Sequence, residues 1–308
     1  MTVQTTLASN ATFTGTGLHT GRPAKCVVKP APAGHGLVFY QFDANEEVSI
    51  LPALWSHVHS AALNTRIGDG NGAEIYTVEH LLAALAGCGV HNATIELHGP
   101  EVPALDGSAA RFVRGVMEAG IVRLDAPLQV VEITSPVTVW TGDAWARLSP
   151  CDRFEIDLTI DFPDPAIGRQ HKVLDLGNGA FVRELCDSRT FCRSADIEHM
   201  RRAGLALGGT YDNAVVFDGA DVLNPGGLRH QDEAVRHKML DVVGDLSLVG
   251  FPVLGRFEGF KSGHALTLRL VEALLSDPAT HRIRLCDADL AARLPGAGLV
   301  PADLAEVA

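Results

Sequence analysis

The spacing of apolar and polar residues along the chain predicts a mixture of strands and helices. Residues 1–60 have the pattern of short strands divided by glycine turns, and residues 92–97 alternate apolar with polar side chains. A period of two is typical of a strand that buries one face. The later strands that we predict cover residues 128–133, 137–140, 146–148, 154–162 and 213–217.

Helical patterns occupy the segments between these strands. Thr77 precedes a nearly unbroken apolar run, residues 78–86, which suits a helix with Thr77 as its N-cap and Gly87 at its end. The other helices that we predict cover residues 108–119, 232–249 and 265–275, and residues 187–203 are expected to be partly helical.

The predicted elements occur in a similar order in two halves of the chain. Each half has strands, a helix, a strand that opens with Asn-Ala, a loop rich in glycine and proline, and another helix. A length of 308 residues also favours two domains, because single cores stop growing near ~250–300 residues. We therefore expect a duplicated α+β unit with a boundary near residues 122–127, which gives two domains, residues 1–126 and 127–308.

The composition narrows the class of protein. Apolar residues make up 46% of the chain and the formal net charge is -12, which indicates a folded protein and argues against a nucleic-acid partner. The six cysteines form no CxxC pair, and the N-terminus lacks the pattern of a signal peptide. No apolar stretch approaches the ~20 residues that cross a bilayer. We expect a cytoplasmic protein without a transmembrane segment.

Polar residues share one face of the predicted helix 232–249. His237 and Asp241 are four positions apart, and Asp245 continues the stripe. An imidazole and a carboxylate with this spacing form a usual half-site for a divalent metal. An isolated pair of this kind is more often a solvated surface pair. Here the stripe runs beside the apolar face that carries Gly244 and Leu248, which favours a metal site over a solvated surface pair.

Glu79 and His80 open a helix that is otherwise apolar. A Glu-His pair in this position requires a buried partner or a ligand, although a glutamate near the helix end beside a satisfied core histidine explains it equally well. With His237 and Asp241, His80 would complete three protein ligands and leave a fourth position for water, as in catalytic zinc. Glu79 would then accept a proton from that water. Iron(II) also suits such donors.

Other histidines carry weaker signals. His264 follows a glycine in a tight loop before a helix, which suits either an exposed acid or a surface histidine. His199 repeats the Glu-His dipeptide on an amphipathic, arginine-rich helix, and we interpret it as a surface residue. His57 and His59 have no supporting neighbours. His19 lies in a glycine-rich turn, where it would either line a cleft or stabilise the turn.

Six ordered motifs resemble one known family. They are GTGLHTG (15–21), TVEHL (77–81), DGSAA (106–110), SRTF (188–191), DEAVRHKMLD (232–241) and KSGH (261–264). Together they resemble the UDP-3-O-acyl-N-acetylglucosamine deacetylases of lipid A and lipopolysaccharide biosynthesis, over residues 2–275. The resemblance implies two α+β sandwiches with the active site between them. It also implies a βαβ insert in the second domain, about residues 190–216, that forms a hydrophobic passage for an acyl chain.

The resemblance assigns a role to each matching residue. His80, His237 and Asp241 match the zinc ligands of the family, while Glu79 matches its general base and His264 its general acid. The further matches are Asp245, which orients His264; Thr190 and Lys238, which stabilise the oxyanion; and Phe162, Phe191, Ile197, Ala206, Thr210, Val216 and Lys261, which contact the substrate.

The implied reaction is the removal of the N-acetyl group from UDP-3-O-acyl-N-acetylglucosamine, by a monomer that requires Zn²⁺ or Fe²⁺. The products are acetate and the free 2-amino sugar. A zinc peptidase is an alternative, but it would usually present H-E-x-x-H with both histidines on one helix. The second alternative is a non-catalytic nucleotide-sugar binding protein, or one with a structural metal, and a structural zinc site would need four protein ligands.

Overall fold

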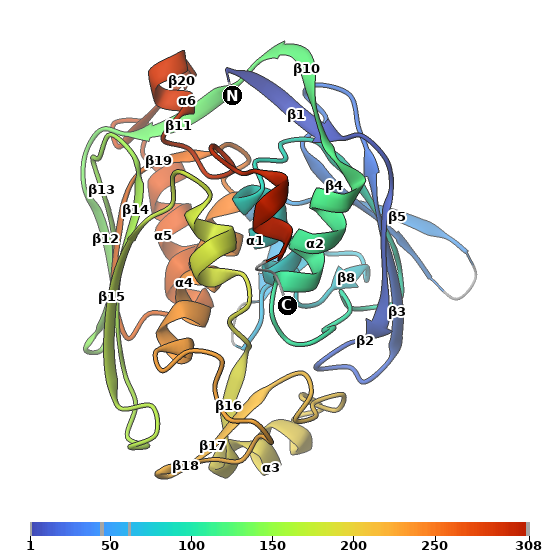
Figure 1. Ribbon diagram of the computed structural model, residues 1–308, viewed down its shortest axis with the longest axis vertical. Coiled ribbons are helices and arrows are strands. Elements are labelled where there is room, and N and C mark those ends of the chain that lie inside the picture. Colours follow the sequence, from blue (N-terminus) through green and yellow to red (C-terminus); the bar gives the residue numbers. More distant parts are fainter. Residues whose placement is uncertain (1, 44–45, 61–62, 306–308) are drawn as a thin grey trace.

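The computed structural model describes residues 2–43, 46–60 and 63–305. In it, the helices at residues 79–87, 110–119, 233–247 and 264–276 lie between two β-sheets (Figure 1). Residue 1 and residues 306–308, at the ends of the two expected domain ranges, lie outside the described residues. Because both sheets turn one face toward the helices, the apolar core forms between the sheets.

The first sheet has the strand order β2-β3-β9-β4-β5. Its strands are β2 (Ala11–Thr16), β3 (Pro23–Pro30), β4 (Leu37–Phe42), β5 (Val48–Pro52) and β9 (Ala93–His98). Only β4 and β9 run parallel, and the other neighbours are antiparallel. Helix α1 (Glu79–Gly87) precedes β9 and α2 (Ala110–Ala119) follows the same strand.

The second sheet repeats this plan. Its matching strands are β12 (Val137–Thr141), β13 (Ala144–Ser149), β14 (Phe154–Asp161), β15 (Arg169–Asp175) and β19 (Val253–Phe260). Among these, only β14 and β19 run parallel, and α4 (Glu233–Ser247) and α5 (His264–Ser276) precede and follow β19. Two further strands, β11 (Gln129–Ile133) and β20 (His281–Leu285), extend the sheet. The predicted α+β class with two similar sandwiches is confirmed.

The matching of elements between the halves was wrong in one respect. The sequence pattern paired the strand at residues 213–217 with the strand at residues 92–97, but the counterpart of β9 is β19. Strand β17 (Val215–Asp218) belongs instead to a three-stranded sheet with β16 (Phe191–Arg193) and β18 (Asp221–Val222). An Asn-Ala start is a local signal, whereas the place of a strand in a sheet depends on its neighbours.

This small sheet carries the expected βαβ insert. Strands β16 and β17 run parallel, and α3 (Ser194–Arg202) connects them. The unit lies apart from both large sheets, at the lower end of Figure 1. The remaining elements are β1 (Val3–Leu7), β6 (Val58–Ser60), β7 (Arg66–Gly68), β8 (Glu74–Ile75), β10 (Ile121–Pro127), α6 (Ala288–Ala291), and the short helices at Trp55–His57, Phe181–Leu185 and Pro301–Ala305.

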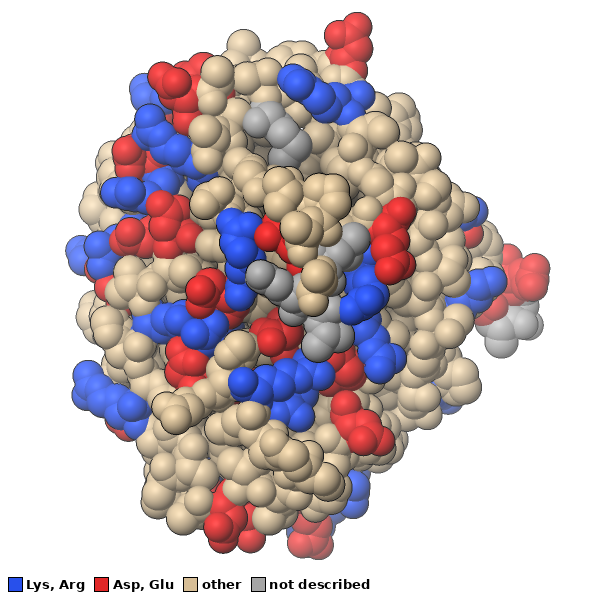
Figure 2. All heavy atoms as spheres, in the orientation of Figure 1, with Lys and Arg blue, Asp and Glu red and all other residues tan. Residues whose placement is uncertain are grey.

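The charges on the surface and the lengths of the helices are relevant to two kinds of partner, nucleic acids and membranes. Among the described residues on the face in Figure 2, Lys and Arg side chains are interspersed with Asp and Glu and form no continuous basic area. None of the described helices combines the length and the apolar character needed to cross a membrane.

The start of α1 differs from the prediction. The N-cap of α1 is Val78, and no side chain caps the helix. Thr77 has a left-handed backbone with φ 59°, which is unusual for a β-branched residue. Its hydroxyl donates to Oε1 of the buried Glu101 at 2.8 Å. This hydrogen bond helps to hold the turn that leads into α1.

Helices α1 and α4 approach each other closely at Gly244. A Cβ atom on Gly244 would lie 2.1 Å from the carbonyl oxygen of Glu79, so no other residue fits without moving a backbone. Around this point the helices bury apolar side chains, including Leu82 and Leu240. The absence of a side chain on Gly244 therefore sets the distance between the two helices.

We predict that Gly244→Ala destabilises the protein. In a helix without this contact, alanine would raise the free energy of unfolding by about 1 kcal/mol. Here the clash with the backbone of Glu79 should lower it by about 2 kcal/mol, which denaturant unfolding would measure. Ser247→Ala, on the same helix, creates no clash and removes one hydrogen bond to the carbonyl of Gly244, so it should change the free energy of unfolding by about 1 kcal/mol or less. A stabilised Gly244→Ala variant would contradict the close packing.

Candidate active site

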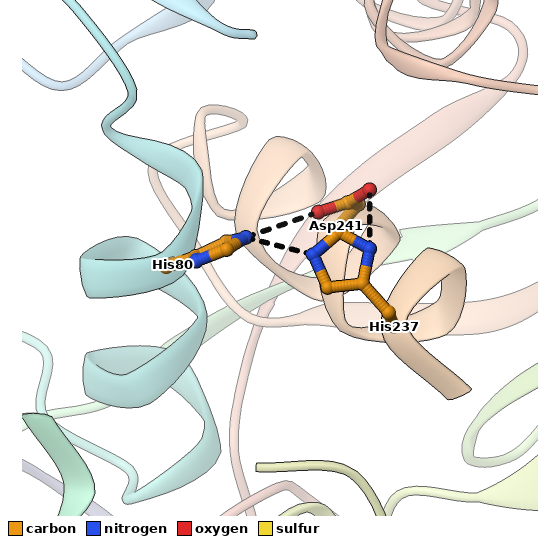
Figure 3. Close-up of side chains that lie close together, drawn as sticks. All are labelled: His80, His237 and Asp241. Carbon is orange, nitrogen blue, oxygen red and sulfur yellow. Dashed lines mark hydrogen bonds and ion pairs between the residues drawn. The ribbon is translucent and has the colours of Figure 1, made fainter. Parts of the chain in front are cut away.

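Three side chains from α1 and α4 converge where the helices cross (Figure 3). The Nε2 atoms of His80 and His237 lie 3.0 Å apart. The carboxylate of Asp241 lies 3.5 Å from a ring nitrogen of each histidine. All three are buried, with exposed fractions of 7%, 3% and 3%. Helix spacing brings His237 and Asp241 to one face, and the helix packing adds His80.

The donor atoms of this cluster suit a metal cation. One ligand atom from each residue lies within 4.8 Å of the others. Within the described structure, Nδ1 of His237 and Oδ1 of Asp241 are buried without a hydrogen-bond partner, which is costly unless another group binds them. Burial also lowers the pKa of His237 well below its usual value, so its ring keeps a free lone pair. The residues present therefore fit a metal.

Glu79 lies beside this cluster without being one of its three donors. Its Oε2 accepts the backbone N–H of Thr65 at 3.1 Å, and its Oε1 lies 3.8 Å from Nε2 of His264. Burial raises the pKa of Glu79 to about 7, because the apolar surroundings disfavour the charged form. A carboxylate with this pKa can accept and release a proton near neutral pH.

His264 faces the cluster from the third helix, α5. The sequence placed it in the preceding loop, but it is the first residue of α5 and is buried. Its Nδ1 lies 2.9 Å from Oδ2 of Asp245, and its Nε2 lies 3.6 Å from Oδ2 of Asp241. Burial lowers the pKa of His264, but the negative charges of Asp245 and Asp241 outweigh burial and raise it to about 9. The ring is therefore protonated at neutral pH.

Lys238 and Phe191 complete one wall of the cluster. Nζ of Lys238 donates to Oδ2 of Asp241 at 2.9 Å. Burial lowers the pKa of Lys238, but the charge of Asp241 outweighs it and the pKa is raised. The ring of Phe191 lies 5.9 Å from His237 and 5.5 Å from Phe162. The structure therefore places Phe191 next to the cluster, and Phe162 packs against Phe191.

The other residues assigned from the resemblance lie farther out or have different partners. Thr190 precedes Phe191, and its backbone bonds to Gly107 and Val215. Lys261 pairs with Asp143 at 2.9 Å and Asp161 at 3.4 Å. The remaining four belong to the insert region, where Ile197 and Ala206 are half-buried, Thr210 is exposed and Val216 is buried.

Two buried residues near the site had no signal in the sequence. Thr65 contacts Glu79, Asp245 and His264, and an isolated threonine in a loop gives no pattern to detect. Glu101 is fully buried and accepts hydrogen bonds from the loop that contains His19. Neither residue belongs to the six motifs, and each makes its contacts with segments that are distant in the sequence.

The fold and the buried donor group together define an α+β metalloenzyme. A family model described as UDP-3-O-acyl N-acetylglycosamine deacetylase matches residues 4–276. Proteins named UDP-3-O-acyl-N-acetylglucosamine deacetylase are similar over nearly the whole chain. The one from Anaeromyxobacter sp. (strain Fw109-5) is 47% identical and covers 95% of each chain. The one from Myxococcus xanthus (strain DK1622) is 46% identical over 91% of this chain and 88% of its own. The chain belongs to the UDP-3-O-acyl-N-acetylglucosamine deacetylase family.

We predict that His237→Gln abolishes tight metal binding. The chain loaded with Zn²⁺ and dialysed should retain one equivalent, measured by elemental analysis, and the variant should retain almost none because it keeps only two of three donors. His199→Gln is the control, since His199 also lies on a helix but is exposed. Equal loss in both variants would contradict the site.

Proposed function

We propose that this chain hydrolyses the N-acetyl amide of UDP-3-O-acyl-N-acetylglucosamine and uses Zn²⁺ held by His80, His237 and Asp241. The observation that carries the proposal is the position of Glu79 and His264. They flank one side of a buried three-donor cluster, and their pKa values are shifted to about 7 and about 9. Relatives named for this deacetylation support the choice of substrate.

The chain's own residues supply the acid and the base of this reaction. When bound, zinc would polarise the acetyl carbonyl and acidify water. Oε1 of Glu79 takes the proton of the attacking water, and Nε2 of His264 delivers a proton to the departing amine. Asp245 holds the opposite ring nitrogen of His264 at 2.9 Å. The products are acetate and the free 2-amino sugar.

The negative charge that develops on the carbonyl oxygen needs donors from the chain. The Lys238 ammonium group lies against Asp241, at the edge of the cluster, and we assign the second donor role to the Thr190 hydroxyl. One preorganised donor of this kind typically contributes ~3–4 kcal/mol to transition-state stabilisation. Thr190 immediately precedes Phe191, whose ring lies near His237, and Lys238 immediately follows His237. These positions beside the cluster support the assignment.

The rest of the proposal concerns the substrate and the chain as a whole. We assign substrate contacts to Phe162, Phe191, Ile197, Ala206, Thr210, Val216 and Lys261. The insert would hold the acyl chain and Lys261 the UDP-sugar.

We also propose two domains, residues 1–126 and 127–308, and a cytoplasmic monomer that binds no nucleic acid. Fe²⁺ is the alternative metal for a His₂Asp site.

We predict acetate release from UDP-3-O-acyl-N-acetylglucosamine by the purified chain. A chelator should abolish the release, and Zn²⁺ should restore it. Glu79→Gln should lower kcat by about 100-fold or more, since general base catalysis contributes typically 10²–10⁴-fold, while the metal content stays the same. A Glu79→Gln variant that keeps wild-type turnover with metal bound would refute the base assignment. No acetate from any acyl chain length would refute the function.

We predict a bell-shaped dependence of the rate on pH. The active form needs Glu79 deprotonated and His264 protonated, so the rate rises as Glu79 loses its proton near pH 7 and falls as His264 loses its proton near pH 9. A bound cation favours both deprotonated forms, so the metal should shift both limbs toward lower pH. Asp245→Asn should move the falling limb further in the same direction, because it removes the negative charge beside His264. An unmoved limb would contradict that assignment.

A further inference from the structure

The loop before β7 places one fully buried threonine against both members of the acid–base pair. Thr65 has an exposed fraction of 0% and lies far in sequence from Asp245 and His264. We propose that Thr65 is a positioning residue for the reaction, because its hydroxyl and its backbone N–H fix the orientation of Asp245 and Glu79. This inference rests on the proposed function.

The hydroxyl of Thr65 determines how Asp245 faces His264. It donates to Oδ1 of Asp245 at 2.6 Å, while Oδ2 of the same carboxylate lies 2.9 Å from Nδ1 of His264. One oxygen is therefore held by Thr65 and the other by the imidazole. Oγ1 of Thr65 also lies 3.2 Å from Nδ1 of His264. The three groups form a closed triangle that fixes the plane of the carboxylate and the direction of the ring.

The backbone of Thr65 fixes the base on the other side. Its N–H donates to Oε2 of Glu79 at 3.1 Å, which leaves Oε1 facing Nε2 of His264 at 3.8 Å. Its carbonyl accepts the N–H of Val78 at 3.3 Å, in the turn that leads into α1. The loop is thus bonded to the start of α1, and Thr65 cannot move without moving Glu79.

A side chain without the hydroxyl would fill the same space but lose this control. Valine has nearly the volume of threonine, so the packing would be kept. Oδ1 of Asp245 would then lose its donor while remaining buried, and the carboxylate could rotate away from His264. Serine keeps the donor. The two substitutions therefore separate the hydrogen bond from the volume.

Kinetics of Thr65→Val and Thr65→Ser test the inference. Thr65→Val should lower kcat by about 10- to 100-fold, as is typical for partners of catalytic and metal-binding groups. The KM for the UDP-sugar and the metal content should stay within about twofold. Thr65→Ser should keep most of the wild-type kcat. In an Asp245→Asn background, Thr65→Val should cost little more, because its main partner is already altered.

A structural control separates positioning from loss of stability. Thr280 is also buried, and its hydroxyl bonds to the carbonyls of Leu274 and Asp277 beyond the far end of α5. Thr280→Val should lower the melting temperature and leave kcat unchanged. Wild-type kcat in Thr65→Val, or an equal loss in Thr65→Ser, would overturn the inference.

A spectroscopic signal distinguishes its failure from failure of the proposed function. A downfield proton resonance from the bond between His264 and Asp245, identified by its loss in His264→Gln, should shift in Thr65→Val. If the wild-type chain releases no acetate, the proposed function fails and the catalytic part of the inference fails with it. If acetate is released but the resonance and kcat are unchanged in Thr65→Val, only the inference fails.

Discussion

The contact between Gly244 and the carbonyl of Glu79 is the constraint on which the site depends. A Cβ atom on Gly244 would lie 2.1 Å from that oxygen. Helices α1 and α4 can therefore approach this closely only because residue 244 has no side chain. The approach brings His80 of α1 within 3.0 Å of His237 of α4. The cluster of three donor side chains therefore depends on how the two helices pack as much as on which residues supply the donors.

Close packing also explains how so many ionisable groups remain in an apolar interior. Buried charges are costly unless they are paired and hydrogen-bonded. Glu79 accepts a backbone N–H, Asp245 binds His264, and Asp241 accepts from Lys238. Within the described part of the donor cluster, one buried atom of His237 and one of Asp241 lack a hydrogen-bond partner, and a cation would satisfy both. Burial raises the pKa of Glu79 to about 7, whereas the charges of Asp245 and Asp241 outweigh burial and raise that of His264 to about 9.

The position of the donor cluster follows from the repetition of one α+β arrangement in the two halves of the fold. Helices α1 and α4 hold equivalent places, each before the central strand of its sheet, and each contributes a histidine to the cluster. The helices that follow those strands are not used alike, since α5 supplies His264 and α2 supplies no member of the cluster. Two similar units thus have different roles at one shared contact, and the βαβ insert of β16, α3 and β17 belongs to the second.

The sequence by itself determined the features that depend on local spacing. The pattern predicted the α+β class and the pair His237 and Asp241, because helix geometry relates positions i and i+4. The βαβ insert was implied by the resemblance to the family. The motifs also indicated the family that the comparisons then established. Spacing alone left His80 and His264 open to other interpretations, because each lies on a different helix from that pair.

Only the tertiary structure decided which distant residues meet. It placed His264 at the buried start of α5, gave β9 its counterpart in β19, and brought Thr65 against Asp245 across 180 positions of the chain. It also showed that Thr77 forms a left-handed turn held by Glu101 instead of capping α1. The physical reason is the same in each case. These contacts depend on how helices and strands pack, and packing is set by surfaces that a linear pattern of residues does not specify.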